Sequence, residues 1–91
     1  MPTVRFTDNI QRHVECPTRV VGGARVRDAL DAYFSANPRA RGYVLDERGR
    51  LREHMAIFVN GGQLRDRAGL TDPVEDEGII DVIQALSGGE S

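Results

Sequence analysis

The 91-residue chain contains a single cysteine, Cys16, and no tryptophan, and all twelve of its basic residues are arginine. A lone cysteine can form no internal disulfide and cannot supply the four thiolates of a plant-type iron–sulfur cluster. Because lysine is missing, no side-chain amine of this protein can accept an acyl group. These absences exclude a disulfide scaffold, a cysteine-ligated iron–sulfur cluster and acylation of its own lysine side chains.

Long hydrophobic runs and an excess of basic charge are missing as well. No apolar run approaches the roughly 20 residues that a membrane-spanning helix needs. Twelve arginines against fourteen acidic residues give a net charge of -2, whereas nucleic-acid-binding proteins usually carry a strongly basic balance. We therefore expect one small cytoplasmic domain that has neither nucleic acid nor membrane as a partner.

The first half of the chain is predicted to form a hairpin followed by a helix. Residues 3–6 alternate with period two, and residues 13–16 are a second strand candidate. The pair Asp8-Asn9 between them favours a turn. Residues 25–37 instead follow a period near 3.6, which predicts a helix that ends before a proline. Its apolar face carries Val26, Ala29, Leu30, Tyr33 and Phe34.

A second hairpin is predicted in the middle of the chain. Residues 55–59 form the strongest strand candidate, and Asn60-Gly61 follows them directly. Asn-Gly is the strongest short hairpin signal, because both residues tolerate positive φ. We expect residues 63–64 to pair back across this turn.

The remaining segments complete a small mixed fold. Residues 43–45 are a short extended candidate, and residues 65–78 are polar and predict a loop with at most a short helical turn. The β-branched run at 79–83 is typical of a central strand. Because the helix and the sheet must each bury one apolar face, we expect an α+β fold. Its layout is that of a ubiquitin-like β-grasp, with a mixed sheet of about four or five strands packed on one main helix.

Three stretches of the chain resemble the MoaD/ThiS family of ubiquitin-like sulfur carriers. Residues 57–61 are similar to the family's strand that ends in Val-Asn-Gly, and residues 75–83 resemble its acidic entry into the last strand. Residues 86–89, Leu-Ser-Gly-Gly, resemble the family's terminal Val-Ala-Gly-Gly. The order and spacing of these motifs match the family over nearly the whole chain.

The resemblance implies a chemistry that is carried out at one terminal atom. In this cycle an E1-like partner uses ATP to adenylate the carboxylate of Gly89, and a sulfur donor displaces AMP and leaves a thiocarboxylate. The sulfur then passes to a sulfur-accepting biosynthetic enzyme. Gly88 and Gly89 lack Cβ atoms, so the tail can enter a narrow active site. The resemblance implies no catalytic residue, metal or bound cofactor in this chain.

One feature departs from the usual family pattern. In most of these carriers the second glycine ends the chain, whereas Glu90 and Ser91 follow Gly89 here. Similar extensions in the carriers of some cysteine and siderophore pathways imply removal by a JAMM-type zinc protease, which would cleave between Gly89 and Glu90. We therefore divide the chain into a β-grasp domain, residues 1–86, and a Gly-Gly tail, residues 87–91. The molybdopterin, thiamin, cysteine and siderophore pathways all remain possible sulfur acceptors.

Strand alternation predicts a partner-binding surface. If the helix covers Ile57, Val59, Ile80 and Val82, then Phe58, Ile79 and Ile83 lie on the open face of the sheet. Leu86 could anchor the root of the tail against a partner. An apolar cluster beside a reactive tail suits docking. The alternatives are ordinary surface hydrophobicity or cover from the N-terminal hairpin.

Other reactive residue types indicate structure rather than chemistry. His13 and His54 are far apart and belong to no zinc-ligand spacing, so we expect both at the surface or at strand edges. Cys16 is expected to pack in the core. Two further functions stay open: a protein modifier joined through Gly89 to target lysines, and a noncovalent interaction module whose tail is never processed.

Overall fold

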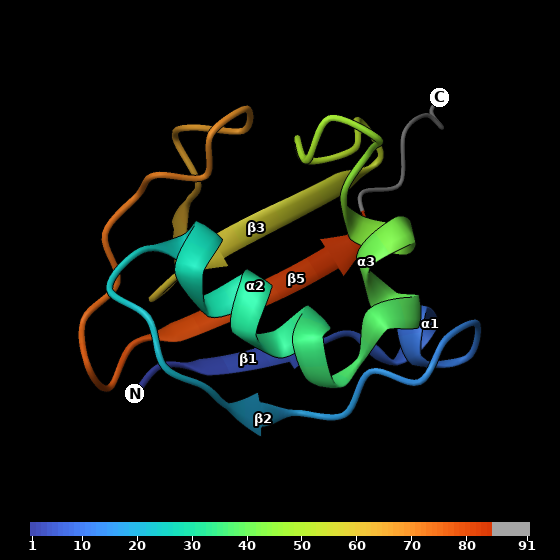
Figure 1. Cartoon of the computed structure of the whole chain (residues 1–91), viewed down its shortest axis with the longest axis horizontal. Helices are drawn as coiled ribbons and strands as arrows, with labels where there is room; N and C mark the ends of the chain where they lie inside the picture. Colours follow the sequence, from blue (N-terminus) through green and yellow to red (C-terminus); the bar gives the residue numbers. More distant parts are fainter. Residues whose placement is uncertain (85–91) are drawn as a thin grey trace.

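The computed structural model describes residues 1–84, and five strands in it form one mixed sheet in the order β2-β1-β5-β3-β4 (Figure 1). The strands are β1 (Thr3–Phe6), β2 (Arg19–Val20), β3 (Met55–Val59), β4 (Gly62–Gln63) and β5 (Ile79–Gln84). Strand β5 runs parallel to β1 and antiparallel to β3. It is therefore the central strand, as its β-branched run predicts.

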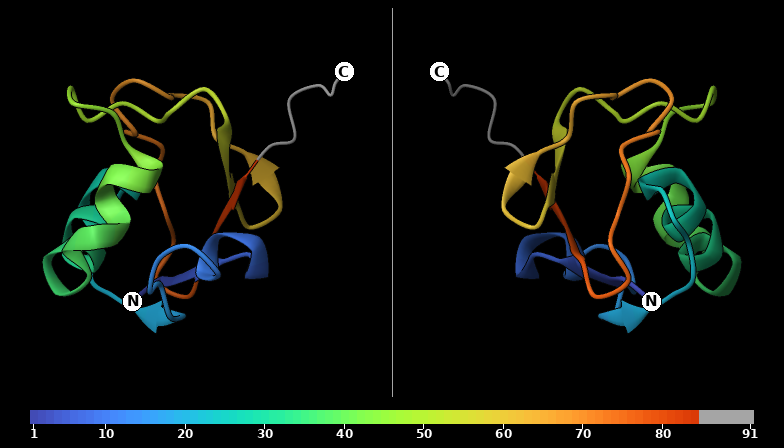
Figure 2. Two further views of the ribbon diagram at one scale, coloured as in Figure 1. Left: turned by 90° about the vertical axis from the view of Figure 1, so that its right-hand side faces the viewer. Right: turned by 90° about the vertical axis from the view of Figure 1, so that its left-hand side faces the viewer.

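Within residues 1–84, three helices accompany the sheet: α1 (Asp8–Gln11), α2 (Val26–Ala36) and α3 (Pro38–Val44). Helices α2 and α3 lie on the same side of the sheet and leave most of its opposite face without a helix over it (Figure 2). The predicted architecture, a mixed sheet on one main helix, is confirmed, and two short helices are added to it. The predicted boundary between residues 1–86 and the tail 87–91 lies outside the described residues.

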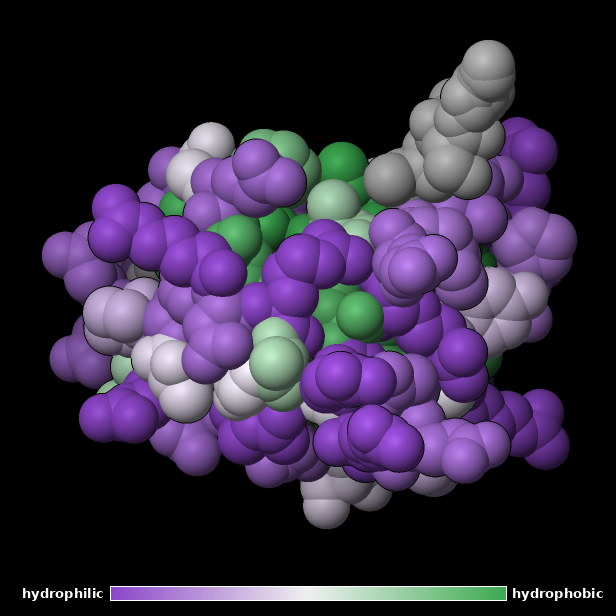
Figure 3. Space-filling model, turned by 90° about the horizontal axis from the view of Figure 1, so that it is seen from above, coloured by the Kyte–Doolittle hydropathy of each residue, from purple (hydrophilic) through white to green (hydrophobic). Residues whose placement is uncertain are grey.

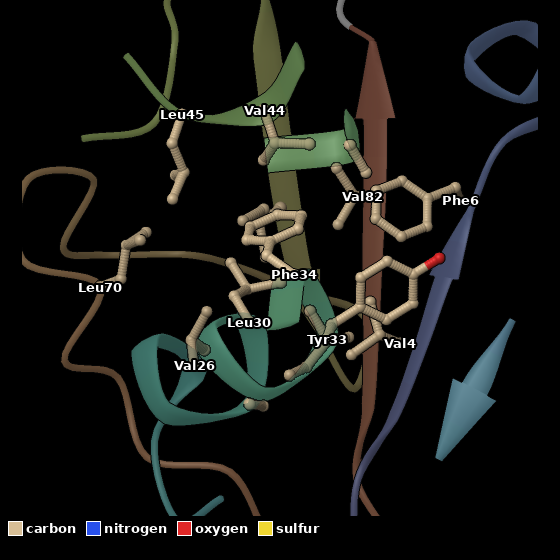
Figure 4. Close-up of a cluster of buried hydrophobic side chains, with 14 of the residues drawn as sticks. Val4, Phe6, Val26, Leu30, Tyr33, Phe34, Val44, Leu45, Leu70 and Val82 are labelled. Atoms are coloured by element: carbon tan, nitrogen blue, oxygen red, sulfur yellow. The ribbon is translucent and has the colours of Figure 1, made fainter. Parts of the chain in front are cut away.

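The core lies between α2 and the sheet (Figure 4). The predicted apolar face of α2 is confirmed, because Val26, Ala29, Leu30, Tyr33 and Phe34 are all buried. The Tyr33 ring lies 5.1 Å from that of Phe6 on β1, centroid to centroid, and its hydroxyl donates a 2.6 Å hydrogen bond to the Pro17 carbonyl. Burial raises the pKa of Tyr33 to about 12. The hydroxyl therefore stays a neutral donor inside the core.

The turn between β3 and β4 follows the prediction, but the returning strand β4 is Gly62–Gln63 and not residues 63–64. Asn60 and Gly61 adopt φ values of 51° and 85°, the left-handed conformations that a tight Asn-Gly turn requires. Residues 58 and 59 pair with residues 63 and 62, so the chain reverses directly at the turn.

The predicted strand at residues 13–16 is wrong, and β2 lies at Arg19–Val20 instead. The Asp8-Asn9 turn is in fact the start of α1. The backbone amides of His13 and Val14 continue from α1 by donating to the Ile10 carbonyl. Cys16 packs into the core instead of pairing along a strand. Alternation over four residues could not distinguish these local bonds from a sheet ladder.

The extended segment predicted at residues 43–45 is wrong for residues 43 and 44, because they belong to α3. The main helix ends at Ala36, close to the expected end, and Pro38 begins a second helix that the sequence pattern does not predict. Proline is tolerated in the first helical turn, where its missing N–H has no intrahelical partner. Ala40 and Val44 of α3 are fully buried, so packing on the core stabilises this short helix.

Candidate functional site

Strand β5 ends at Gln84, which pairs with Met55 at the start of β3. Four predicted site residues follow this point: Leu86, Gly88, Gly89 and Glu90. They lie outside the described residues. The structure therefore describes the strand from which the tail continues and the surfaces around that strand.

The open face of the sheet carries the three predicted partner-binding residues on β3 and β5. Ile80 and Val82 point toward the helices and are fully buried, whereas Phe58, Ile79 and Ile83 lie on the other face and are half-buried. Phe58 pairs directly with Asp81, so both isoleucines are its diagonal neighbours. The predicted alternation is confirmed, and the three apolar residues form one patch, which we call the open-face patch.

An ion pair lies at the centre of this patch, and sequence reasoning missed it. Arg5 on β1 pairs in register with Asp81 on β5. Its Nε and Nη2 atoms donate to the two carboxylate oxygens at 2.7 and 2.9 Å, a bidentate geometry. The hydrogen bond to Asp81, reinforced by its charge, raises the pKa of Arg5. An open face that is apolar at its flanks therefore has a charged, polar centre.

The Asn60 side chain links the hairpin turn to the neighbouring central strand. Its Oδ1 accepts a 2.8 Å hydrogen bond from the Ile79 backbone amide, and the backbone amide of Asn60 donates to the Ile79 carbonyl at 2.8 Å. Its Nδ2 donates to a Glu75 carboxylate oxygen at 3.3 Å. Asn60 thus joins the hairpin to the start of β5 and to the acidic segment before it.

The remaining candidate residues occupy the places that the sequence predicts. Cys16 is buried, and burial raises the pKa of its thiol, which disfavours a reactive thiolate. His13 and His54 are exposed, and the His13 ring stacks on Tyr43 with a centroid distance of 5.9 Å. Within residues 1–84, no cluster of three or more histidine, cysteine or acidic side chains could hold a metal ion. None of the helices in this range is long and apolar enough to cross a membrane.

Comparison with known proteins gives matches in structure. No family model and no curated protein matches the chain by sequence. A chain of the BexX/CysO complex from Amycolatopsis orientalis aligns with a TM-score of 0.81 and 22% identity, over 98% of this chain and 100% of that one. CysO from Mycobacterium tuberculosis aligns with a TM-score of 0.80 and 17% identity, over 94% and 100%.

A third solved structure adds a different kind of protein. SAMP1 from Haloferax volcanii, a small archaeal modifier protein, aligns with a TM-score of 0.74 and 25% identity, over 97% of this chain and 98% of that one. These likenesses confirm the ubiquitin-like β-grasp fold over nearly the whole chain. They also confirm, as a likeness of fold, the predicted resemblance to MoaD/ThiS-type carriers.

Proposed function

We propose that this chain is a ubiquitin-like sulfur carrier that acts through Gly89. Cleavage between Gly89 and Glu90 frees the Gly89 carboxylate. An E1-like enzyme joins this carboxylate to the AMP part of ATP and releases pyrophosphate. Hydrosulfide, or a sulfur donor equivalent to it, then displaces AMP and leaves a thiocarboxylate. In this scheme the chain is a protein substrate, and its partner enzymes catalyse the reactions.

The observation that carries this proposal is the likeness of the whole fold to CysO, together with a Gly-Gly pair that follows the central strand. Strand β5 ends at Gln84, and only three residues separate it from Gly88. A glycine pair offers little steric bulk close to its own carboxylate. A partner can therefore hold the folded domain while it acts on the tail.

The open-face patch supports the docking part of the proposal. Phe58, Ile79 and Ile83 lie together on a sheet face that is not covered by α2 or α3, and Leu86 follows β5 by two residues. We assign this surface to the E1-like enzyme and to the sulfur-accepting enzyme. The two-residue extension favours a JAMM-type zinc protease as a third partner, in a cytoplasmic pathway of cysteine or secondary-metabolite synthesis.

Intact-mass spectrometry of the protein from its native host tests this function. We expect a species that ends at Gly89 and has one oxygen replaced by sulfur. A chain truncated after Gly89 should support sulfur transfer without the protease, whereas Gly89→Ala should abolish it. Persistence of full-length chain alone under sulfur demand, or a fully active Gly89→Ala variant, contradicts the proposal and favours the noncovalent interaction module.

The likeness to SAMP1 favours protein modification as a second candidate function. The same activated Gly89 would then form an amide bond to a lysine of a target protein. Tryptic peptides that carry a Gly-Gly remnant on lysine would identify such conjugates. Because this protein has no lysine, one copy of it cannot be attached to a lysine side chain of another copy. Conjugates should therefore carry no polymer of this protein linked through its own lysine side chains.

A further inference from the structure

A basic groove lies at the end of the sheet where β5 finishes. It has a volume of about 560 Å³ and is formed by the segment between α3 and β3 together with residues 67–68. Its charged lining consists of three arginines, Arg50, Arg52 and Arg67, and two acidic residues, Asp46 and Glu53, and His54 lies beside them. Two smaller hollows next to it share Arg52. Figure 3 looks onto the face above these loops, which is mostly hydrophilic with small apolar areas between the polar side chains.

Two of these arginines are held in place by backbone carbonyls. Arg67 Nη2 donates to the carbonyls of Arg52 and Met55 at 2.7 and 2.9 Å, and Arg52 Nε donates to the Gly42 carbonyl at 2.8 Å. These bonds use only part of the five N–H donors of each guanidinium. Neither arginine forms an ion pair with a carboxylate in residues 1–84. The groove therefore presents positioned guanidinium groups that still have donors to offer.

The groove has a small excess of positive charge, whereas the complete chain has a net charge of -2. Three arginines and two acidic residues line it, and the segment 38–54 that forms most of it contains five arginines and three acidic residues. Arg50 has only a 3.6 Å contact with Asp46, and it is half-exposed. The carboxylate of Asp46 is already bound by the backbone amides of Arg48 and Arg50, which lower its pKa. Asp46 therefore stays ionised and, with Glu53, offsets part of the charge of the three arginines, which leaves the charged lining with an excess of one positive charge.

The groove adjoins the root of the tail. Its lining runs through His54, and the next residue, Met55, pairs with Gln84 at the end of β5. An enzyme that acts on a glycine a few residues beyond Gln84 has to approach this end of the molecule. A protein segment in contact with the groove would thus lie close to Gln84, the last described residue before the tail.

We propose that the basic groove binds an acidic peptide segment of the enzyme that acts on the tail. Carboxylates match the forked donors of arginine, and bidentate pairs of this kind give geometric specificity as well as attraction. The identity of the partner rests on the proposed carrier function, whereas the binding of carboxylates rests only on the groove. Exposed charges at such a rim also raise the rate of association, and salt weakens this effect.

Binding of a synthetic hexaglutamate peptide to the full-length chain tests the groove directly. At low ionic strength we expect backbone amide NMR shifts centred on residues 46–54 and 67–68, which fade as salt is added. The variants Arg50→Gln and Arg52→Gln should each weaken binding about fivefold, the upper range for an exposed ion pair. Arg50→Lys should retain part of the affinity. The matched control is Arg19→Gln on β2, at the opposite edge of the sheet, which should leave binding unchanged.

Several results would overturn the groove proposal. One is that Arg19→Gln weakens peptide binding as much as the groove variants do. Another is that the amide NMR shifts spread over the whole surface. A third is that inorganic phosphate at equal concentration displaces the peptide, which would indicate a phosphate site. The proposed function is tested separately by adenylation of the chain truncated after Gly89. Adenylation without peptide binding removes only the groove proposal. Peptide binding without adenylation removes the carrier function and with it the identity of the partner, and leaves only the binding of carboxylates by the groove.

Discussion

The two faces of β5 carry similar apolar residues in different surroundings. On one face, Ile80 and Val82 are fully buried beneath the helices. On the other, Ile79 and Ile83 are half-buried and flank an ion pair between Asp81 and Arg5. The residue types alone would not distinguish Ile79 from Ile80, yet one belongs to the core and the other to a surface. Burial against α2 and α3 therefore separates a stabilising face from a face that is available for recognition.

Two adjacent isoleucines give the sharpest test of this difference. Ile80→Ala removes buried methyl groups and leaves a cavity, so we expect the free energy of unfolding to fall by about 2–5 kcal/mol. Ile79→Ala on the open face should cost about 1 kcal/mol or less, because its surroundings include solvent. Urea denaturation measures both values, provided that the m-value stays constant. Equal losses for the two variants would contradict the distinction between the faces.

Substitution of Asn60 tests what fixes the register between β3 and β5. A slip of one residue between β3 and β5 would exchange the buried and open residues. Asn60→Ala loses the side-chain bonds to Ile79 and Glu75 and disfavours a positive φ, so we expect a loss of about 1–3 kcal/mol in the free energy of unfolding.

Asn60→Gly separates the two contributions of this residue, because glycine adopts the turn conformation but cannot make the side-chain bonds. We expect its stability to lie between that of the wild type and that of Asn60→Ala, as measured by thermal denaturation. Stability equal to that of Asn60→Ala would assign the whole effect to the hydrogen bonds.

The smallest effect is expected from the ion pair on the open face. The Arg5 and Asp81 side chains are 49% and 31% exposed, so water and salt screen their attraction. A double-mutant cycle with Arg5→Gln and Asp81→Asn should show less coupling in stability than the loss caused by Asn60→Ala, and this coupling should shrink in high salt. Coupling that is large and independent of salt would show that the open face contributes to stability as the core does.

Most of the fold could be predicted from local patterns in the sequence. The helix face from Val26 to Phe34 and the turn at Asn60 are confirmed, because each depends on residues a few positions apart. The second strand was misplaced, and α3 was missed. In both segments the packing of short pieces on the core, seen at Cys16 and Val44, outweighs their weak local preferences.

The sequence by itself determined which residues of β5 share a face, because side chains alternate along any strand. It also determined where a Gly-Gly pair follows that strand. Only the tertiary structure decided that Arg5 lies beside Asp81, 76 positions later, and that Arg67 lies beside Arg52. These neighbours depend on which strands and loops become adjacent when the apolar faces of the sheet and helices are buried together. That arrangement is a property of the whole core, which no single segment encodes.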